Sequence, residues 1–382
     1  KSLKFDRPMK INLIGKITLG CATALLAAAL IHHYSDRSGC NDCNTVSLPR
    51  SETTERLASA MDSLWAKAAA DSIDLHSVMI VRDDSVIYEH WANGAHPDSL
   101  HVLYSVSKTF TSLGVGMAIA DGLLSLDEHI VDIFPGYLPD SVSSNLAQMT
   151  VEDLLTMSSG HAHAPELYTS ITKNDTASSW IAQFLASPVE YEPGAVFSYN
   201  SMATYMLSAA VQIRSGQKLL DYLSTRLFEP LGIEGAVWDE SPEGINTGGW
   251  GLHLRTEDLA KTGQLMLDRG KWQGKQLVPA EWIDRMSARH VQSVQGTPNS
   301  LEYIPTDEDF ANSDWVQGYG YQVWRCRHNA YRADGSFGQF IVVIPDYDTV
   351  VAMTAGSHTY QKQLNLVWDY ILPVIGRAKQ NN

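Results

Sequence analysis

The sequence predicts an α+β fold in which strands from both ends of the chain form one antiparallel sheet around an inserted helical lobe. Two apolar runs near the amino end, 77–81 and 86–91, are joined by a short Asp-rich turn, as in a β-hairpin. The same arrangement recurs near the carboxyl end at 340–345 and 349–354. Such hairpins argue against a doubly wound parallel sheet, and the mostly helical stretch between them predicts the lobe.

Helices are expected on the outer side of both hairpins. The first should begin near Thr53 or Thr54, either of which can cap it. Its apolar positions recur at helical spacing: Leu57, Ala58, Met61, Leu64 and Trp65. A second helical stretch, from about residue 361 to 375, closes the fold.

The first 36 residues differ in charge from the rest of the chain. They carry five basic and two acidic residues, a net of +3, so the remainder holds −18 of the total of −15. The apolar run 17–31 that follows the basic residues has the form of a secretory signal, and 11–31 is long enough to cross a bilayer if Lys16 snorkels. We expect an uncleaved membrane anchor, with a cleaved signal peptide as the alternative. Both alternatives predict that the rest of the chain is exported to the periplasm or cell envelope.

These patterns divide the chain into an anchor or signal (1–36), a polar linker (37–52) and one large domain (53–378). The acidity of that domain argues against nucleic-acid binding. Cys40 and Cys43 lie close enough to pair in an exported protein, but their state stays open, as does the oligomeric state. His161 and His163 lack a third ligand at matching spacing, so we expect neither a metal nor a cofactor.

The strongest chemical signal is Ser105-x-x-Lys108 before the apolar helical run 113–120. Residues three apart on a helix share a face, so the two side chains come within hydrogen-bond reach. A lysine in a dry site loses its proton more readily, and a helix N-terminus favours a developing alkoxide. Alone, the spacing is weak evidence because it often occurs by chance, and the alternative is a capping serine with a solvated lysine.

The stretch 103–139 resembles the family of class C β-lactamases, related esterases and 6-aminohexanoate-dimer hydrolases. Further segments similar to that family follow in its order: 151–160, 193–201, 248–282, 318–322 and 333–339. The resemblance covers about residues 55–375 and implies a β-lactamase/transpeptidase-like fold.

The resemblance also implies roles. Ser105 would attack a carbonyl to form an acyl-enzyme, Lys108 would take its proton, and Tyr199 would relay protons to the leaving group. The oxyanion hole would use the backbone N–H of Ser105 and that of Ser336, which follows Gly335. Tyr168 is a candidate hydrogen-bond donor to substrate, with an ordinary surface tyrosine as the alternative.

Two departures from the family pattern bear on substrate. Ser201 stands where β-lactamases have the asparagine that contacts the substrate amide, with Asn200 one position early. Ala333 stands where they have the Lys or His that meets a substrate carboxylate, and strand alternation should point Arg332 to the other face. These departures favour the amidase and esterase members of the family. The motif sequences most resemble those of the 6-aminohexanoate-dimer hydrolase branch.

The sequence therefore predicts a serine hydrolase whose partner is a small-molecule amide or ester. A β-lactamase or D-Ala carboxypeptidase is the first alternative, and a non-catalytic envelope sensor or binding protein is the second. An α/β-hydrolase is unsupported because no serine of this chain lies in Gly-x-Ser-x-Gly.

Overall fold

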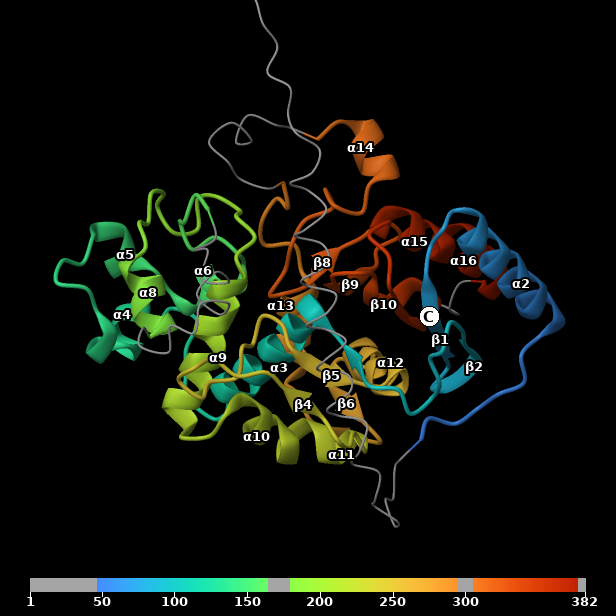
Figure 1. Ribbon diagram of the computed structural model, residues 1–382, viewed down its shortest axis with the longest axis horizontal. Coiled ribbons are helices and arrows are strands. Elements are labelled where there is room, and N and C mark those ends of the chain that lie inside the picture. Colours follow the sequence, from blue (N-terminus) through green and yellow to red (C-terminus); the bar gives the residue numbers. More distant parts are fainter. Residues whose placement is uncertain (1–46, 164–178, 295–304, 377–382) are drawn as a thin grey trace, which may run out of the picture. The chain divides into compact units, whose positions relative to one another are not determined.

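The structure, a computed structural model, describes residues 47–163, 179–294 and 305–376 (Figure 1). Its main sheet is antiparallel throughout, in the order β2-β1-β11-β10-β9-β8. These strands are β1 (Leu75–Arg82), β2 (Ser85–Trp91), β8 (Trp324–Arg325), β9 (Tyr331–Gly335), β10 (Gln339–Ile344) and β11 (Thr349–Ala355). Both expected hairpins are present and meet through β1 and β11, which confirms the predicted fold class.

The central strands are buried on both faces, which is why they read as continuous apolar runs. On one face, α2 (Glu55–Ala70), α15 (Tyr360–Leu366), the π-helical turn η6 (Val367–Ile371) and α16 (Leu372–Ile375) contribute to one hydrophobic cluster. On the other face, α3 (Ser107–Ala120) and α12 (Thr256–Leu267) pack against the same strands. Side chains of one strand alternate between the two clusters, as Val342 and Val343 do.

The outer helices are where the sequence predicts them. Thr54 caps α2, since its side chain accepts a hydrogen bond from the N–H of Leu57. Thr53 instead donates its hydroxyl to the carbonyl of Ile87 on β2, 2.6 Å away. The closing helical stretch runs from Tyr360 to Ile375, interrupted by one π-helical turn.

Between the hairpins lies the helical lobe, drawn in green and yellow in Figure 1. Its helix α9 packs against α3, so the lobe is built onto the helix that carries the Ser-x-x-Lys motif. The remaining helices and helical turns of the described residues are η2 (Tyr104–Val106), α4 (Ile130–Ile133), η3 (Pro135–Tyr137), α5 (Ser144–Gln148), α6 (Val151–Leu155), α8 (Trp180–Ala186), α9 (Ser201–Ser215), α10 (Leu219–Leu223), η4 (Ser224–Phe228), α11 (Glu229–Leu231), α13 (Ala280–Ser287), α14 (Asp307–Asn312) and η5 (Pro345–Tyr347). Two small sheets complete the fold: β3 (His101–Val102), β5 (Leu252–Leu254) and β4 (Val237–Trp238), and β6 (Lys271–Trp272) with β7 (Lys275–Gln276).

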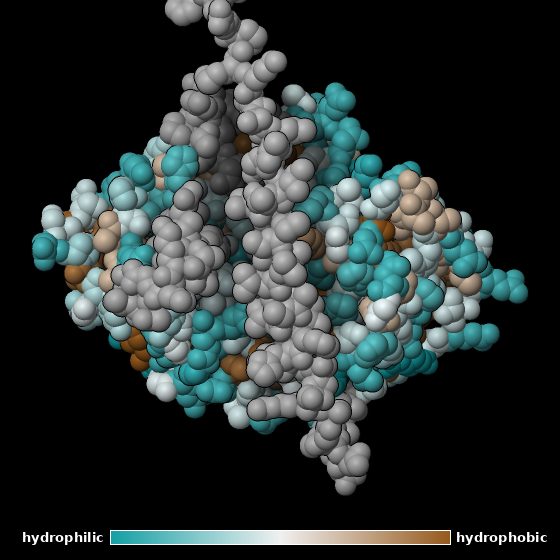
Figure 2. Space-filling view, in the orientation of Figure 1, coloured by the Kyte–Doolittle hydropathy of each residue, from teal (hydrophilic) through white to brown (hydrophobic). Residues whose placement is uncertain are grey.

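The end of the predicted linker lies against the domain. Leu48 is buried in the main cluster, and Arg50 forms ion pairs with Glu89 and Glu257 at 3.0 and 2.9 Å. In the view of Figure 2, the described surface is mostly hydrophilic, with small scattered apolar patches. Within residues 47–163, 179–294 and 305–376, no helix combines the length and apolarity that a membrane crossing requires. The expected anchor at 1–36 lies outside the described residues.

Candidate active site

Ser105 lies in the 3₁₀ turn η2, immediately before α3. Strand β5 fixes this junction from one side: the carbonyl of Leu252 accepts from the N–H of Leu103 at 2.8 Å, and its N–H donates to the hydroxyl of Ser107 at 3.1 Å. Tyr104 adopts φ = +48°, a left-handed conformation that costs energy for a residue with a side chain. The chain thus makes a sharp, externally held turn at the residue that carries the hydroxyl.

Lys108 lies one helical turn further on and is almost completely buried, with 1% of its surface exposed. Its Nζ is 2.9 Å from the hydroxyl of Ser105, 2.9 Å from the hydroxyl of Ser201 and 2.6 Å from the carbonyl oxygen of Gly249. Ser201 begins α9, and Gly249 belongs to a loop of the lobe. Two distant segments and the neighbouring turn η2 therefore converge on one amine.

The surroundings of Lys108 favour the neutral amine. Burial lowers its pKa to about 7, although the carboxylate of Asp334 acts in the opposite direction. A neutral amine has two N–H donors and one lone pair. The Gly249 carbonyl can only accept, and the Ser201 hydroxyl can accept the second N–H, so the lone pair remains for the O–H of Ser105. This is the arrangement that a general base requires.

Tyr199 immediately precedes Asn200, whose side chain caps α9 by accepting from the N–H groups of Met202 and Ala203. Its ring stacks on Trp324 with centroids 5.6 Å apart, and the Nζ of Lys108 lies 4.9 Å from the ring centroid. The structure therefore brings Ser105, Lys108 and Tyr199 together, as the resemblance implies.

These residues border a cavity of about 460 Å³ that has mainly apolar and aromatic walls. It is lined by Ser105, Tyr199, Ser293, Val294, Trp315, Val316, Trp324, Asp334, Ser336 and Tyr360. The expected second oxyanion-hole residue, Ser336, thus shares a cavity with Ser105. Tyr168, the expected donor from a loop, lies outside the described residues.

Gly335 explains how the two residues expected to form the oxyanion hole come close. A Cβ at this position would lie only 2.3 Å from the carbonyl oxygen of Leu103, in the segment that leads into η2. Strand β9 can approach that segment only because residue 335 has no side chain. The close approach brings the end of β9, and with it the adjoining Ser336, to the turn that carries Ser105.

Strand β9 presents no cation to the cavity. Ala333 is fully buried in the main core cluster and does not line the cavity. Strand alternation does turn Arg332 to the opposite face, but that face includes Asp334, which lines the cavity. Arg332 lies behind the cavity wall, with its guanidinium carbon 4.6 Å from the ring centroid of Trp315. Asp334 was not among the predicted site residues, and the only sequence signal for it is the position of an acid directly before Gly335.

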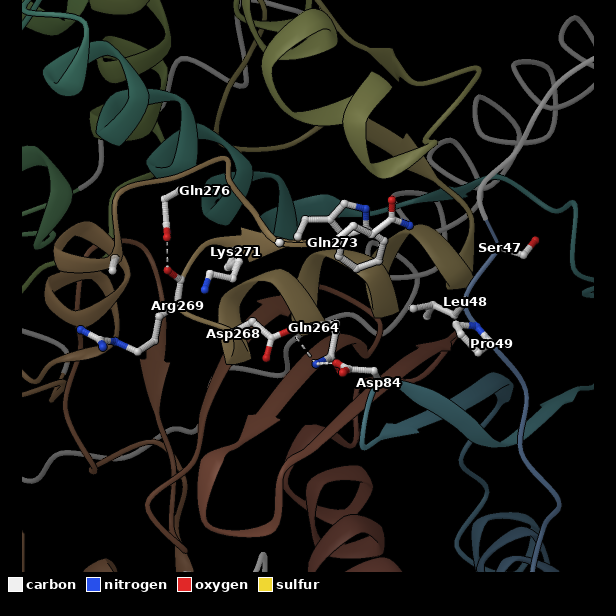
Figure 3. Close-up of a pocket in the computed structure, with 13 residues that line it drawn as sticks. Ser47, Leu48, Pro49, Asp84, Gln264, Asp268, Arg269, Lys271, Gln273 and Gln276 are labelled. Carbon is white, nitrogen blue, oxygen red and sulfur yellow. Dashed lines mark hydrogen bonds between the residues drawn. The ribbon is translucent and has the colours of Figure 1, made fainter. Parts of the chain in front are cut away.

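Two other features are unrelated to this chemistry. His161 is buried, with its Nδ1 3.0 Å from the Ser159 hydroxyl, and the described residues hold no group of three or more His, Cys, Asp or Glu side chains placed to bind a metal. A larger cavity of about 630 Å³ lies at α12 (Figure 3), where Gln264 donates to Asp84. None of its lining residues is one of the expected site residues.

Comparisons with known proteins show the family of this chain. The chain matches the beta-lactamase family over residues 60–372. The 6-aminohexanoate-dimer hydrolase of Paenarthrobacter ureafaciens is 24% identical over 287 residues, which cover 72% of this chain and 70% of that protein. Esterase EstB of Burkholderia gladioli is 25% identical over 198 residues, 46% of this chain and 50% of the esterase.

The fold has close structural counterparts. A solved Bacillus anthracis protein provisionally named as a 6-aminohexanoate-dimer hydrolase aligns with a TM-score of 0.69 at 19% identity, covering 86% of this chain and 87% of that one. The hydrolase EstCE1, described as having promiscuous acyltransferase activity, aligns with a TM-score of 0.66 at 17% identity, covering 84% and 99%. The resemblance inferred from the motifs is therefore confirmed: the chain belongs to the beta-lactamase family and is a serine hydrolase.

Proposed function

We propose that this protein hydrolyses a short amide or ester through an acyl-enzyme on Ser105. The observation that carries the proposal is the 2.9 Å contact between the Ser105 hydroxyl and the buried amine of Lys108, whose pKa burial lowers to about 7. A solvated lysine would be protonated at neutral pH and could not accept the serine proton. A capping serine with a solvated lysine, the alternative explanation of the motif, does not fit a lysine that is 1% exposed.

The proposed reaction starts with the neutral amine of Lys108 taking the proton of Ser105 as its oxygen attacks the substrate carbonyl. The N–H groups of Ser105 and Ser336 would stabilise the oxyanion that develops. Tyr199 would pass a proton to the leaving amine or alcohol. The same groups, acting in reverse, would activate the water that releases the acid and regenerates Ser105.

The cavity favours an amidase or esterase over a β-lactamase or D-Ala carboxypeptidase. Among the described residues that line it, none is a lysine, arginine or histidine that would pair with a substrate carboxylate. Its volume of about 460 Å³ suits a small substrate. Two of the relatives have names that support the same choice, a 6-aminohexanoate-dimer hydrolase and an esterase.

Covalent labelling tests the proposal and separates an enzyme from a non-catalytic envelope sensor. A fluorophosphonate should modify the purified protein once, and peptide mass spectrometry should place the adduct on Ser105. Ser105→Ala should abolish labelling and the burst of p-nitrophenol from p-nitrophenyl butyrate.

Ser112→Ala is the matched control. Ser112 lies on the same helix, and its buried hydroxyl has no hydrogen-bond partner among the described residues. Its removal should leave labelling intact and keep or raise the melting temperature. An adduct on another residue would contradict the assignment of Ser105. The absence of any adduct, together with no hydrolysis of esters, linear amides or nitrocefin, would favour a binding or sensing role instead.

We also propose that the protein is exported and held in the cell envelope by its first 36 residues. The basic start and the apolar run 17–31 support this location. Fractionation of cells that express the whole chain should place it in the membrane or the periplasm. Recovery in the cytosolic fraction would contradict the proposal.

A further inference from the structure

Asp334 is an ionisable residue in the wall of the Ser105 cavity. It lies one residue before Gly335, the position where β9 comes against the segment leading into η2, and its side chain is 10% exposed. Its charge acts on Lys108, since it raises the pKa that burial lowers. The carboxylate is therefore electrostatically coupled to the reacting groups.

Arg332 holds Asp334 from behind. Its Nε donates to a carboxylate oxygen of Asp334 at 2.7 Å, and another of its nitrogens donates to the carbonyl of Asp314 at 2.9 Å. Although burial disfavours its charge, Cys326 and Asp334 hold the pKa of Arg332 above its ordinary value. Arg332 is fully buried and does not line the cavity, whereas Asp334 does. The ion pair thus turns its negative end toward the substrate.

Among the described residues that line the cavity, no cation is present to neutralise the carboxylate of Asp334. Its other members are serines, valines, tryptophans and tyrosines. Lys108 lies below the surface, and the form proposed to start the reaction is uncharged. A substrate carboxylate would meet a like charge in a partly dry site, while an ammonium group would find a partner.

We propose that Asp334 is a specificity-determining residue that makes this enzyme prefer acyl groups bearing an ammonium and reject those bearing a carboxylate. The inference rests on the proposed function and adds the charge of the substrate to it. The polarity is opposite to the one that recognition of a β-lactam carboxylate requires, and it arises from the acid at 334 together with the buried Ala333.

Three p-nitroanilides of similar size test the proposal on the whole protein: β-alanyl (cationic), butyryl (neutral) and succinyl (anionic). The wild type should show the highest kcat/KM for the β-alanyl compound and the lowest for the succinyl compound, with a ratio of at least about tenfold between them. Added salt should reduce that ratio. Asp334→Asn should shrink the ratio by about tenfold, and Asp334→Glu should keep most of it.

Asp314→Asn is the matched control, because Asp314 is a buried acid beside the same arginine but does not line the cavity. In folded protein, Asp314→Asn should leave the ratio of kcat/KM between the β-alanyl and succinyl compounds unchanged. Equal kcat/KM for the three compounds in the wild type would overturn the proposal, even if Asp334→Asn failed to fold. An equal fall on all three in Asp334→Asn would also overturn it, since that is the result of a structural role. The proposed function fails separately, if Ser105 takes no label and no compound is hydrolysed.

Discussion

Replacing Lys108 by methionine is expected to lower kcat/KM for p-nitrophenyl butyrate by about a thousandfold, within the range that a general base contributes. Methionine has nearly the same length but no proton acceptor, so Ser105 would keep its place and lose its base. Folding should not suffer. The Gly249 carbonyl and the Ser201 hydroxyl lose a donor, but the cost of keeping a lysine buried disappears. Steady-state kinetics and thermal unfolding of the same preparation measure both effects.

The pH dependence of Lys108 gives a second readout. Because burial lowers its pKa to about 7, the amine is protonated and inactive as a base below that pH and neutral above it. We therefore expect kcat/KM of the wild type to rise with pH through a midpoint near 7.

The same pKa affects folding stability. In the unfolded chain the lysine holds its proton up to its ordinary pKa of 10.5, so the unfolded state binds more protons than the folded state between about pH 7 and 10.5. This group's contribution to folding stability thus rises with pH over that window, and Lys108→Met should lose both pH effects.

Lys261→Met separates catalysis from the general effect of removing a buried lysine. Lys261 lies on α12, donates to the Gly232 carbonyl at 3.1 Å and faces the buried Asp258 at 3.8 Å. Its loss leaves the buried carboxylate of Asp258 without its ion-pair partner, so the melting temperature should fall while the activity of the folded fraction is unchanged. The base assignment is wrong if Lys108→Met retains more than a tenth of wild-type kcat/KM.

Local patterns predicted the parts of this site that depend on neighbours in sequence. The hairpin 77–91 follows from apolar runs and a turn, and the reach of Lys108 to Ser105 follows from the spacing of a helix. The position of Tyr199 came from the ordered landmarks of the resemblance, since no spacing rule connects it to a serine 94 residues earlier.

The structure was needed for contacts between distant segments. The carbonyl of Gly249 approaches Lys108 across 141 positions of sequence, and a backbone acceptor has no side-chain signature. Strand alternation places Arg332 and Asp334 on one face of β9, and only the tertiary structure shows that Asp334 lines the cavity while Arg332 is buried behind it. The role of Tyr168 and the anchor at 1–36 stay predictions, since both lie outside the described residues.

Tyr199→Phe is expected to lower kcat by about a hundredfold, with little change in stability. The substitution removes only the hydroxyl and preserves the stacking of the ring on Trp324 at 5.6 Å and its edge contact with Tyr319 at 6.3 Å. The loss should be larger for anilides than for p-nitrophenyl esters. An anilide's leaving amine must gain a proton, whereas p-nitrophenolate leaves without one, so a proton relay through Tyr199 affects the amide most.

Tyr319→Phe is the matched control for this relay. Tyr319 belongs to the same aromatic cluster but is buried and does not line the cavity, so the activity toward both substrate types should persist. An equal small effect of Tyr199→Phe on esters and anilides would mean that the ring only shapes the cavity. A selective loss on anilides would place a proton donor on the leaving-group side of Ser105. That outcome would complete the division of labour: Lys108 takes the proton of the nucleophile, and Tyr199 delivers one to the product.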